Sequence, residues 1–246
     1  MAAKETSRIN ELWANILEEN QLTDFEAFWA LPPDWVEPIN TKHKEWSGVT
    51  RLTLTSSNEV FFVKRQQAPR RYTLDKAQQD QRRFTLRFPF GVLTYRLEYN
   101  VLRRDIPIGK PDWVYFGESN TQNESSSVLV TRALPEQFVQ LDQLVVSDEH
   151  ADFNATIGNF KEIGAQLCAM HQRKFRHGAL FARHIYVDPK TCEVRLIDFE
   201  RSRYCLSATT AARKDLKQFL RRDHGLNEQQ LDALLTPYRT HIPSAL

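Results

Sequence analysis

The segment from His177 to Glu200 constrains the fold of this chain more than any other. It reads HGALFARHIYVDPKTCEVRLIDFE. Two β-type runs, 185–187 and 194–197, flank the turn residues Asp-Pro-Lys at 188–190, which predicts a short hairpin. Because apolar residues directly precede Asp198, its carboxylate is expected at the end of a strand, where it faces a crevice.

A His-Gly loop after a long helix, then a hairpin, then an aspartate is the layout of a kinase catalytic segment. That layout carries two carboxylates, one in the loop and one after the hairpin. The loop position here is Ala179, 19 residues before Asp198, which is close to the spacing that the layout requires. The segment therefore predicts a phosphotransferase frame whose Mg²⁺-binding aspartate is present and whose loop carboxylate is absent.

Length and composition narrow the class of protein. The 246 residues can bury a core as one two-lobed domain or as two small ones. A net charge of +2 gives no global attraction to nucleic acid. Three cysteines cannot all pair, which favours a reducing compartment. No signal-type segment and no run of ~20 apolar residues occurs, so we expect a cytoplasmic protein without a transmembrane segment or a nucleic-acid partner.

The order of elements predicts a strand-rich first half and a mostly helical second half. The expected helices are an amphipathic one from Ile9 to Leu17 and others near 25–29, 94–104, 157–171 and 208–238, the last one split at His224-Gly225. The expected strands lie near 49–54, 60–63, 114–116, 128–130, 185–187 and 194–197. This order indicates an α+β fold with two unequal lobes and a crevice near residues 131–136.

Three residues of the first half fit the handling of ATP phosphates, which needs a strand lysine and a glutamate on the following helix. Lys64 is expected to end the strand 61–63, and Glu98 lies in the next helix as its ion-pair partner. Gly48, just before the first strand, would cover the phosphates with backbone N–H groups. The alternative interpretation of Lys64 and Glu98 is an ordinary surface charge pair.

The second half offers the metal-binding and catalytic candidates. Asp198 is the expected Mg²⁺ ligand, and Glu200 could reach the same metal or its water. His184 lies where kinases usually place an asparagine metal ligand. His177 is expected to be a structural core histidine rather than an acid or base.

Residues 64–87 are strongly basic, with eight Lys and Arg against two Asp and a net charge of +6. One interpretation is a solvated loop. The other is a patch that contacts an anionic substrate or an anionic membrane surface.

Several blocks of sequence together resemble the InaA-type lipopolysaccharide kinase family. This family belongs to the protein-kinase-like superfamily, beside the heptose and Kdo kinases of the lipopolysaccharide core, and the resemblance covers roughly residues 25–220. The blocks are Trp35-Val36-Glu37-Pro38-x-Asn40, Trp46-Ser47-Gly48-Val49-x-Arg51-Leu52, Lys64-Arg65-Gln66, Arg96-x-Glu98-Tyr99, Leu129-Val130-Thr131-x-Ala133-Leu134, His177-Gly178-Ala179-Leu180-x-x-x-His184-Ile185 and Leu196-Ile197-Asp198-x-Glu200-x-x-Arg203.

The resemblance implies a single bilobal protein-kinase-like domain over 1–246. Its small β-rich N-lobe would hold one helix and the N-terminal helices over about 1–132, and its helical C-lobe would span about 133–246. It also implies ATP and Mg²⁺, and a lipopolysaccharide-core sugar or another small hydroxyl compound as acceptor. The expected location is the Gram-negative cytoplasm, peripheral to the inner membrane.

By the same resemblance, each matched residue takes a role. Lys64 is the ATP lysine and Glu98 its partner, while Gly48, Thr131 and Ala133 join them as cofactor-binding positions. Asp198 and His184 bind the metal, and the catalytic set is Asp198, Glu200 and Lys64.

Ala179 departs from the sugar kinases beside this family, which keep an aspartate there. General-base help contributes roughly 10²–10⁴ in rate, but phosphoryl transfer depends largely on positioning and metal electrostatics. Three hypotheses follow: an active kinase in which Glu200 or another carboxylate substitutes, a nucleotide-binding pseudokinase with a regulatory or scaffolding role, and a binding domain without nucleotide.

Overall fold

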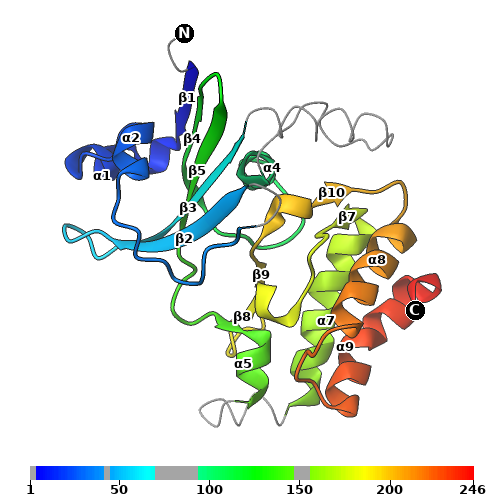
Figure 1. Cartoon of the computed structure of the whole chain (residues 1–246). Coiled ribbons are helices and arrows are strands. Elements are labelled where there is room, and N and C mark those ends of the chain that lie inside the picture. The colour runs from blue at the N-terminus through cyan, green and yellow to red at the C-terminus, as the bar shows by residue number, and fades with distance from the viewer. Residues whose placement is uncertain (1–3, 42–44, 70–93, 147–155) are drawn as a thin grey trace. The chain divides into compact units, whose positions relative to one another are not determined.

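The chain folds into two units, each with its own core. The computed structural model describes residues 4–41, 45–69, 94–146 and 156–246. Unit 1 comprises Met1–Arg103 and Asp112–Ala133, and unit 2 comprises Arg104–Pro111 and Leu134–Leu246. The strands of unit 1 and the helices of unit 2 are coloured by residue number in Figure 1.

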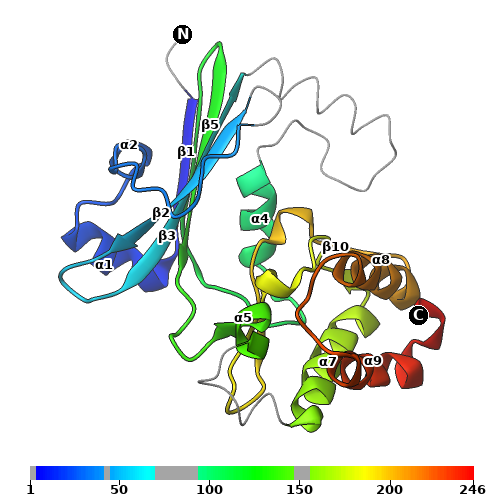
Figure 2. The same cartoon turned by 60° about the horizontal axis from the view of Figure 1, so that its bottom comes forward.

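Unit 1 is built on a five-stranded antiparallel sheet in the order β1-β4-β5-β3-β2. Its strands are β1 (Lys4–Ile9), β2 (Trp46–Thr53), β3 (Val60–Pro69), β4 (Trp113–Asn120) and β5 (Glu124–Arg132). Helices α1 (Ala14–Glu19) and α2 (Phe25–Trp29) lie on one face of this sheet, and α4 (Thr94–Leu102) lies on the other (Figures 1 and 2).

Alternation along β3 assigns its side chains to these two faces, because successive residues of a strand point in opposite directions. Phe61 and Val63 are fully buried in the core that α1 and α2 cover. Lys64 and Gln66 point to the other face and reach residues of α4. The strands predicted near 49–54 and 60–63 are confirmed as the antiparallel neighbours β2 and β3. Strand β3 continues to Pro69, so Lys64 lies inside the strand and not at its end.

The predicted helix from Ile9 to Leu17 is wrong in its first half. Residues 4–9 form β1, whose Ile9 pairs with Tyr115 of β4, and α1 begins only at Ala14. Leu12, an apolar residue inside the predicted amphipathic helix, is 84% exposed. Local periodicity could not reveal β1, because this strand is stabilised by pairing with residues more than a hundred positions away.

Unit 2 is mainly helical, as predicted. Its helices are α5 (Leu141–Val146), α7 (Ile157–Gln172), α8 (Ala208–Leu220) and α9 (Glu228–His241). Its short strands are β6 (Val139–Gln140), β7 (Phe175–Arg176), β8 (Ile185–Val187), β9 (Val194–Leu196) and β10 (Arg203–Tyr204). They form a β6-β8-β9 sheet and a β10-β7 pair, and the predicted hairpin is β8 and β9.

Helix α7 forms the centre of unit 2, with α8 and α9 packed beside it (Figure 2). Its buried stripe includes Phe160, Ile163, Leu167 and His171, as the sequence pattern predicted. Helix α9 starts with a capping box in which Asn227 and Gln230 satisfy each other's backbone N–H groups. Within the described ranges, no helix has the length and hydrophobicity needed to cross a bilayer.

Candidate functional site

Lys64 and Glu98 form the ion pair that the sequence predicted. Lys64 Nζ lies 2.6 Å from Glu98 Oε1. Glu98 is buried, with 2% of its side chain exposed, and the side chain of Lys64 is 16% exposed. The pair is therefore not the solvated surface contact of the alternative interpretation, and it fixes the ammonium group on the α4 side of the sheet.

Two further contacts hold α4 in place beside this pair. Thr94 Oγ1 donates to Gln66 Oε1 at 2.9 Å, one turn before Glu98. Arg96 Nε donates to Glu118 Oε1 of β4 at 2.6 Å. The helix that carries Glu98 is thus attached to two different strands, so the Lys64–Glu98 geometry does not depend on the ion pair alone.

Gly48 lies inside β2, opposite Arg65 of β3, and not before the strand as we expected. The ring of Trp35 covers it, and a Cβ at this position would lie 2.5 Å from a ring carbon. The close approach of Trp35 explains why a glycine occurs here. The other two predicted cofactor positions are at the end of β5: Thr131 is buried opposite Phe62, and Ala133 donates its N–H to the Val60 carbonyl.

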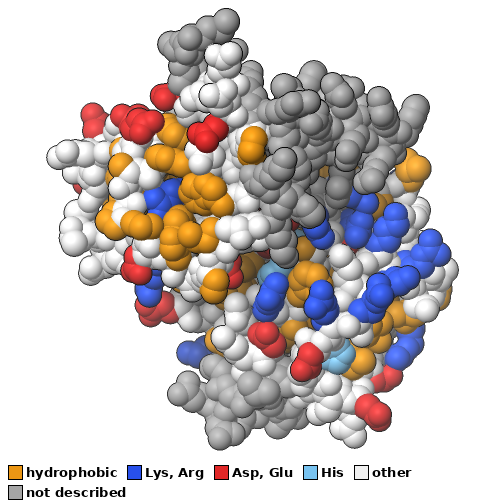
Figure 3. All heavy atoms as spheres, in the orientation of Figure 1, with side chains coloured by type: hydrophobic (Ala, Val, Ile, Leu, Met, Phe, Trp, Pro, Cys, Tyr) orange, Lys and Arg blue, Asp and Glu red, His pale blue; other side chains and the backbone are white. Residues whose placement is uncertain are grey.

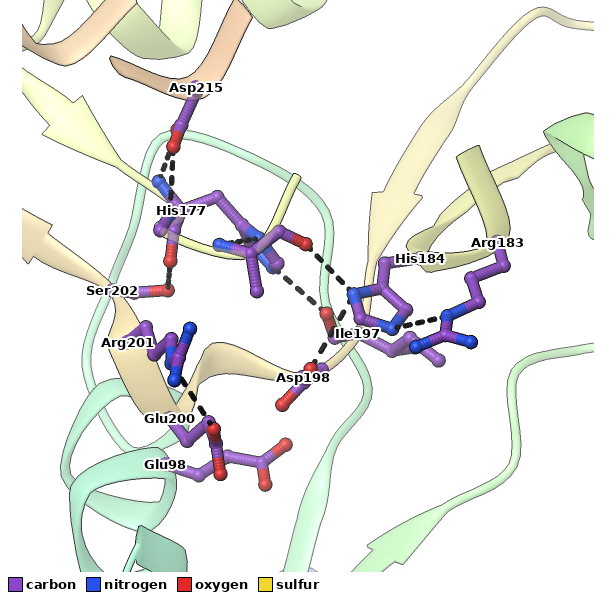
Figure 4. Close-up of polar contacts among 12 residues, drawn as sticks. Glu98, His177, Arg183, His184, Ile197, Asp198, Glu200, Arg201, Ser202 and Asp215 are labelled. Atoms are coloured by element: carbon purple, nitrogen blue, oxygen red, sulfur yellow. Dashed lines mark hydrogen bonds and ion pairs between the residues drawn. The ribbon is translucent and has the colours of Figure 1, made fainter. Parts of the chain in front are cut away.

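In unit 2, one buried carboxylate holds the loop that begins at His177 (Figure 4). Asp215 Oδ2 accepts the His177 N–H at 2.7 Å, and Oδ1 accepts the Gly178 N–H at 2.9 Å. Arg176 Nε donates to Oδ1 at 3.3 Å. His171 Nε2 lies 3.1 Å from Oδ2, and because a carboxylate only accepts, Nε2 is the donor. Four donors, one from α7 and three from the 176–178 segment, therefore donate to the Asp215 carboxylate of α8.

These donors also determine the charge of Asp215. Burial by itself raises the pKa of this carboxyl, but the hydrogen bonds that it accepts, first that of His171 and then that of the Gly178 N–H, outweigh burial. The pKa of Asp215 therefore lies below its ordinary value, and the group is ionised at neutral pH. A fully buried carboxylate needs such partners to remain charged.

His177 connects the loop to the strand end that precedes Asp198. Its ring is fully buried, and Nε2 lies 2.8 Å from the Ile197 carbonyl, so Nε2 is the donor. Nδ1 accepts the Ala179 N–H at 3.3 Å. Burial lowers the pKa of His177, against the opposing charges of Asp215 and Asp198. The neutral imidazole is a structural link, in line with the sequence interpretation.

Asp198 follows β9 in the left-handed region, with φ 67° and ψ 61°. A non-glycine residue in this conformation is costly and occurs mainly where the surrounding structure enforces it, often at functional sites. Its side chain is 32% exposed, and Oδ2 lies 3.5 Å from His184 Nδ1. The strand-end position predicted for this carboxylate is thus confirmed.

His184 and Glu200 lie on the two sides of Asp198 in the sequence. His184 Nδ1 lies 2.8 Å from the Ala179 carbonyl, to which it donates, and Nε2 lies 3.4 Å from Arg183 Nε. A metal could use Nε2 only if Arg183 moved. Glu200 lies in the short 3-10 turn after Asp198, and its Oε1 is 3.6 Å from Arg201 Nε.

Ala179 is 4% exposed. Its N–H and carbonyl are both used, by His177 and His184. The backbone of the loop is therefore held at the one position where the expected carboxylate is missing. In the described part of the chain, no group of three or more His, Cys, Asp or Glu residues is arranged to hold a metal ion by itself.

The model of the Lipopolysaccharide kinase (Kdo/WaaP) family matches residues 26–238 of this chain. The chain belongs to this family. The match includes both parts of the candidate site, from Gly48 to Asp215, and confirms the family resemblance that the sequence blocks predicted.

Two relatives illustrate the extent of the similarity. The family member described here is 25% identical to Protein InaA of Escherichia coli (strain K12) over 203 residues, which are 79% of this chain and 86% of that protein. The solved structure of WaaP in complex with acyl carrier protein covers 96% of this chain, which in turn covers 89% of WaaP, with a TM-score of 0.56 and 15% identity. This likeness confirms a mixed α/β, kinase-like fold.

The residue that sequence reasoning missed is Asp215. It lies in the middle of α8, 38 residues after His177, and no short motif marks it. The available signal was a single acidic residue on the apolar stripe of a helix, among Ala211, Ala212 and Phe219, all buried. A buried carboxylate on such a stripe requires partners, and in this Kdo/WaaP-family chain the partners are the loop's own N–H groups.

Proposed function

We propose that this protein is an ATP- and Mg²⁺-dependent phosphotransferase that acts on a lipopolysaccharide-core sugar or another small hydroxyl acceptor. The observation that carries the proposal is the Lys64–Glu98 ion pair at 2.6 Å. In kinases such a pair must be in place for the phosphates of ATP to be held. We place this activity in the cytoplasm, next to the inner membrane.

In each unit we propose residues that would contact Mg-ATP. Lys64 would contact the phosphates while Glu98 holds it, and Gly48, Thr131 and Ala133 would be the positions along the nucleotide. Asp198 would hold Mg²⁺, which prefers oxygen ligands, with Glu200 as a second carboxylate. When bound, Mg-ATP supplies the phosphoryl group and neutralises charge on its oxygens.

We propose that His184 orients Asp198. Its Nδ1 proton goes to the Ala179 carbonyl, so the ring holds the loop beside the Asp198 carboxylate at a fixed distance. A direct metal contact through Nε2 is the alternative role for His184. A single protein-kinase-like domain with lobes of about 1–132 and 133–246 is part of the proposal.

Ala179 requires another route for the proton of the acceptor hydroxyl. Glu200 is the carboxylate that we propose to take it. Since general-base help contributes roughly 10²–10⁴ in rate, a chain without this base can keep most of the catalysis that positioning and charge provide. We expect measurable but slow transfer.

The test is to incubate pure protein with Mg-ATP and delipidated core oligosaccharide and to measure phosphate on the sugar. Transfer by the wild type that is lost in Asp198→Asn and kept in the exposed control Asp223→Asn supports the proposal. If no phosphate moves while Asp198→Asn abolishes nucleotide binding, activity on this class of acceptor is refuted.

The second candidate function is a nucleotide-binding pseudokinase, which the buried Ala179 favours because its small side chain leaves the loop intact and without a base. It predicts that Mg-ATP stabilises the protein by about 2.7 kcal/mol at a hundredfold excess over Kd and that Ala179→Asp leaves cellular function unchanged. A thermal scan without any shift would instead favour a binding domain without nucleotide.

Two partner proposals complete this picture. Contact of the basic segment 64–87 with an anionic membrane surface is proposed for its residues 70–87, which lie outside the described residues. Lys64 and Arg65 are excluded from this contact because they lie in β3, where Lys64 is paired with Glu98 and Arg65 is 4% exposed. The structural neighbour WaaP was solved in complex with acyl carrier protein, so acyl carrier protein is a candidate partner here as well.

A further inference from the structure

A groove of about 740 Å³ lies in unit 2, on the side of α8 that carries Arg213, Lys217 and Arg221. Helix α9 contributes Leu235 and Arg239 to its walls. This volume is within the range of roughly 300–1,000 Å³ that small-molecule sites occupy. The groove is separate from the loop at 177–179 and from Asp198, none of which lines it.

The groove-lining residues of α8 form one stripe together with Arg221, the C-cap residue that follows the helix. The three cations follow each other at intervals of four, and Leu216 and Leu220 lie between them at i+3 and i+7. Residues at these spacings share one face of a helix. The stripe is exposed at all three cations, and in Figure 3 basic side chains gather over the α8 part of unit 2 with hydrophobic ones among them.

The apolar part of the groove consists of buried leucines at its base and exposed leucines at its edge. Leu216 and Leu235 are buried beneath it at 2% and 9% exposure, while Leu220 and Leu246 remain 42% and 54% exposed. Exposed leucines among cations are typical of surfaces that meet an amphiphile, because a purely polar ligand would leave the leucines in water.

The charged side chains of the groove have one sign. Its lining holds four cations, and among the described residues no Asp or Glu side chain lines it. Arg239 is 2.7 Å from Asp232, but both side chains are half exposed or more, so this pair is weak. The only acidic residue of α8, Asp215, is buried and already committed to the loop. The groove therefore attracts an anion.

We propose that this groove binds an anionic lipid at the surface of a bilayer. An acyl chain would lie along Leu216, Leu220 and Leu235, and the headgroup phosphate would meet the cations of the rim. Peripheral membrane binding that lasts needs two signals, an apolar contact and a basic patch, and this groove combines them within a few turns of helix. The inference names a further site for the membrane contact that the proposed function includes, and it does not use the nucleotide site.

The test is sedimentation of the full chain with vesicles, without nucleotide. Binding is expected to vesicles of phosphatidylglycerol with phosphatidylcholine, to be weak for phosphatidylcholine alone, and to fall as salt rises. The triple variant Arg213→Glu, Lys217→Glu, Arg221→Glu should bind at least about tenfold more weakly.

A control with the same change of charge is Arg51→Glu, Lys161→Glu, Lys190→Glu, at exposed positions that do not line the groove. It should keep most of the binding, and circular dichroism of both triple variants should match that of the wild type. Equal loss in both triples, or no binding to anionic vesicles, would overturn the proposal. The vesicle assay contains no ATP, so its result is distinct from that of the phosphotransfer assay.

A substitution in the apolar part of the groove tests whether the ligand is a lipid or another kind of anion. Leu220→Asn, at an exposed position, should weaken vesicle binding several-fold and leave binding of inorganic phosphate and poly-L-glutamate unchanged. If poly-L-glutamate displaces the vesicles and Leu220→Asn has no effect, the groove is a site for an acidic polypeptide and the lipid proposal is wrong. Binding of inorganic phosphate without binding of anionic vesicles would also refute the lipid proposal.

Discussion

The candidate site is held together differently in the two units. In unit 1, Lys64 and Glu98 contact each other directly, so the residues proposed to act are also the residues that fix the geometry. In unit 2, the loop at 177–179 and the strand end before Asp198 are held by the hydrogen bonds of Asp215 and His177, both of which are fully buried. A supporting network of this kind can be kept even when a catalytic side chain such as the one at position 179 is absent.

The largest expected effect comes from removing the buried support in unit 2. Asp215→Ala leaves the N–H groups of His177 and Gly178 and the side chains of Arg176 and His171 without their acceptor. Breaking a buried charged network costs about 3–5 kcal/mol. We expect a loss of this size in the free energy of unfolding, measured by chemical denaturation.

The matched control is Asp223→Ala, an exposed aspartate just after α8. It should change the free energy of unfolding by about 0.5 kcal/mol or less. Equal stability of Asp215→Ala and the control would mean that the loop does not depend on this carboxylate.

The second prediction addresses unit 1, where the effect should appear in activity. Lys64→Met removes the cation proposed to meet the phosphates, and losing one such preorganised group costs about 10²–10³ in rate. Initial rates of phosphate transfer measure the loss. Glu98→Gln keeps a hydrogen-bond acceptor beside Lys64 and should cost less. Lys161→Met on the surface of α7 is the control, and a Lys64→Met enzyme as fast as this control would exclude the ATP-lysine role.

Sequence patterns located those parts of the site that depend on neighbours along the chain. The strand residues before Lys64, the helix around Glu98 and the apolar pair before Asp198 all carry local signals, and each element lies where the pattern predicted it within a few residues. Local periodicity also located α7 and the hairpin of β8 and β9.

Features that depend on contacts distant in sequence could not be predicted in this way. Strand β1 exists because β4 pairs with it, and Gly48 is explained only by the ring of Trp35 above it. Asp215 accepts the hydrogen bonds of the loop only because α8 packs beside it. Sequence patterns can therefore identify the candidate site residues. The residues that hold them in place, such as Asp215, are determined by tertiary packing.

The third prediction concerns the turn of the loop itself. Gly178 has φ +87°, and a Cβ there would lie 2.4 Å from the Arg201 carbonyl oxygen. Gly178→Ala should therefore lower the free energy of unfolding by about 1–3 kcal/mol. Gly158→Ala, in the first turn of α7 with only Thr156 Cγ2 at 3.9 Å, should be neutral or slightly stabilising. Equal effects of the two substitutions in thermal unfolding would contradict the strain argument.

The smallest expected effect is a pH dependence that comes from His177. Burial lowers the pKa of its ring in the folded state below the ordinary value of 6.5, in spite of the charges of Asp215 and Asp198. The unfolded chain therefore binds the proton more readily, and the free energy of unfolding rises with pH. The stability that the neutral ring contributes is fully present above pH 6.5 and is lost as the pH falls through the folded-state pKa.

Denaturation at pH values from about 5 to 8 should show this slope in the wild type and in His241→Gln, whose histidine is exposed. His177→Gln should flatten it, because glutamine does not titrate. A slope of unchanged size in His177→Gln would assign the pH dependence to another group and would leave the link between the loop and Ile197 purely geometric.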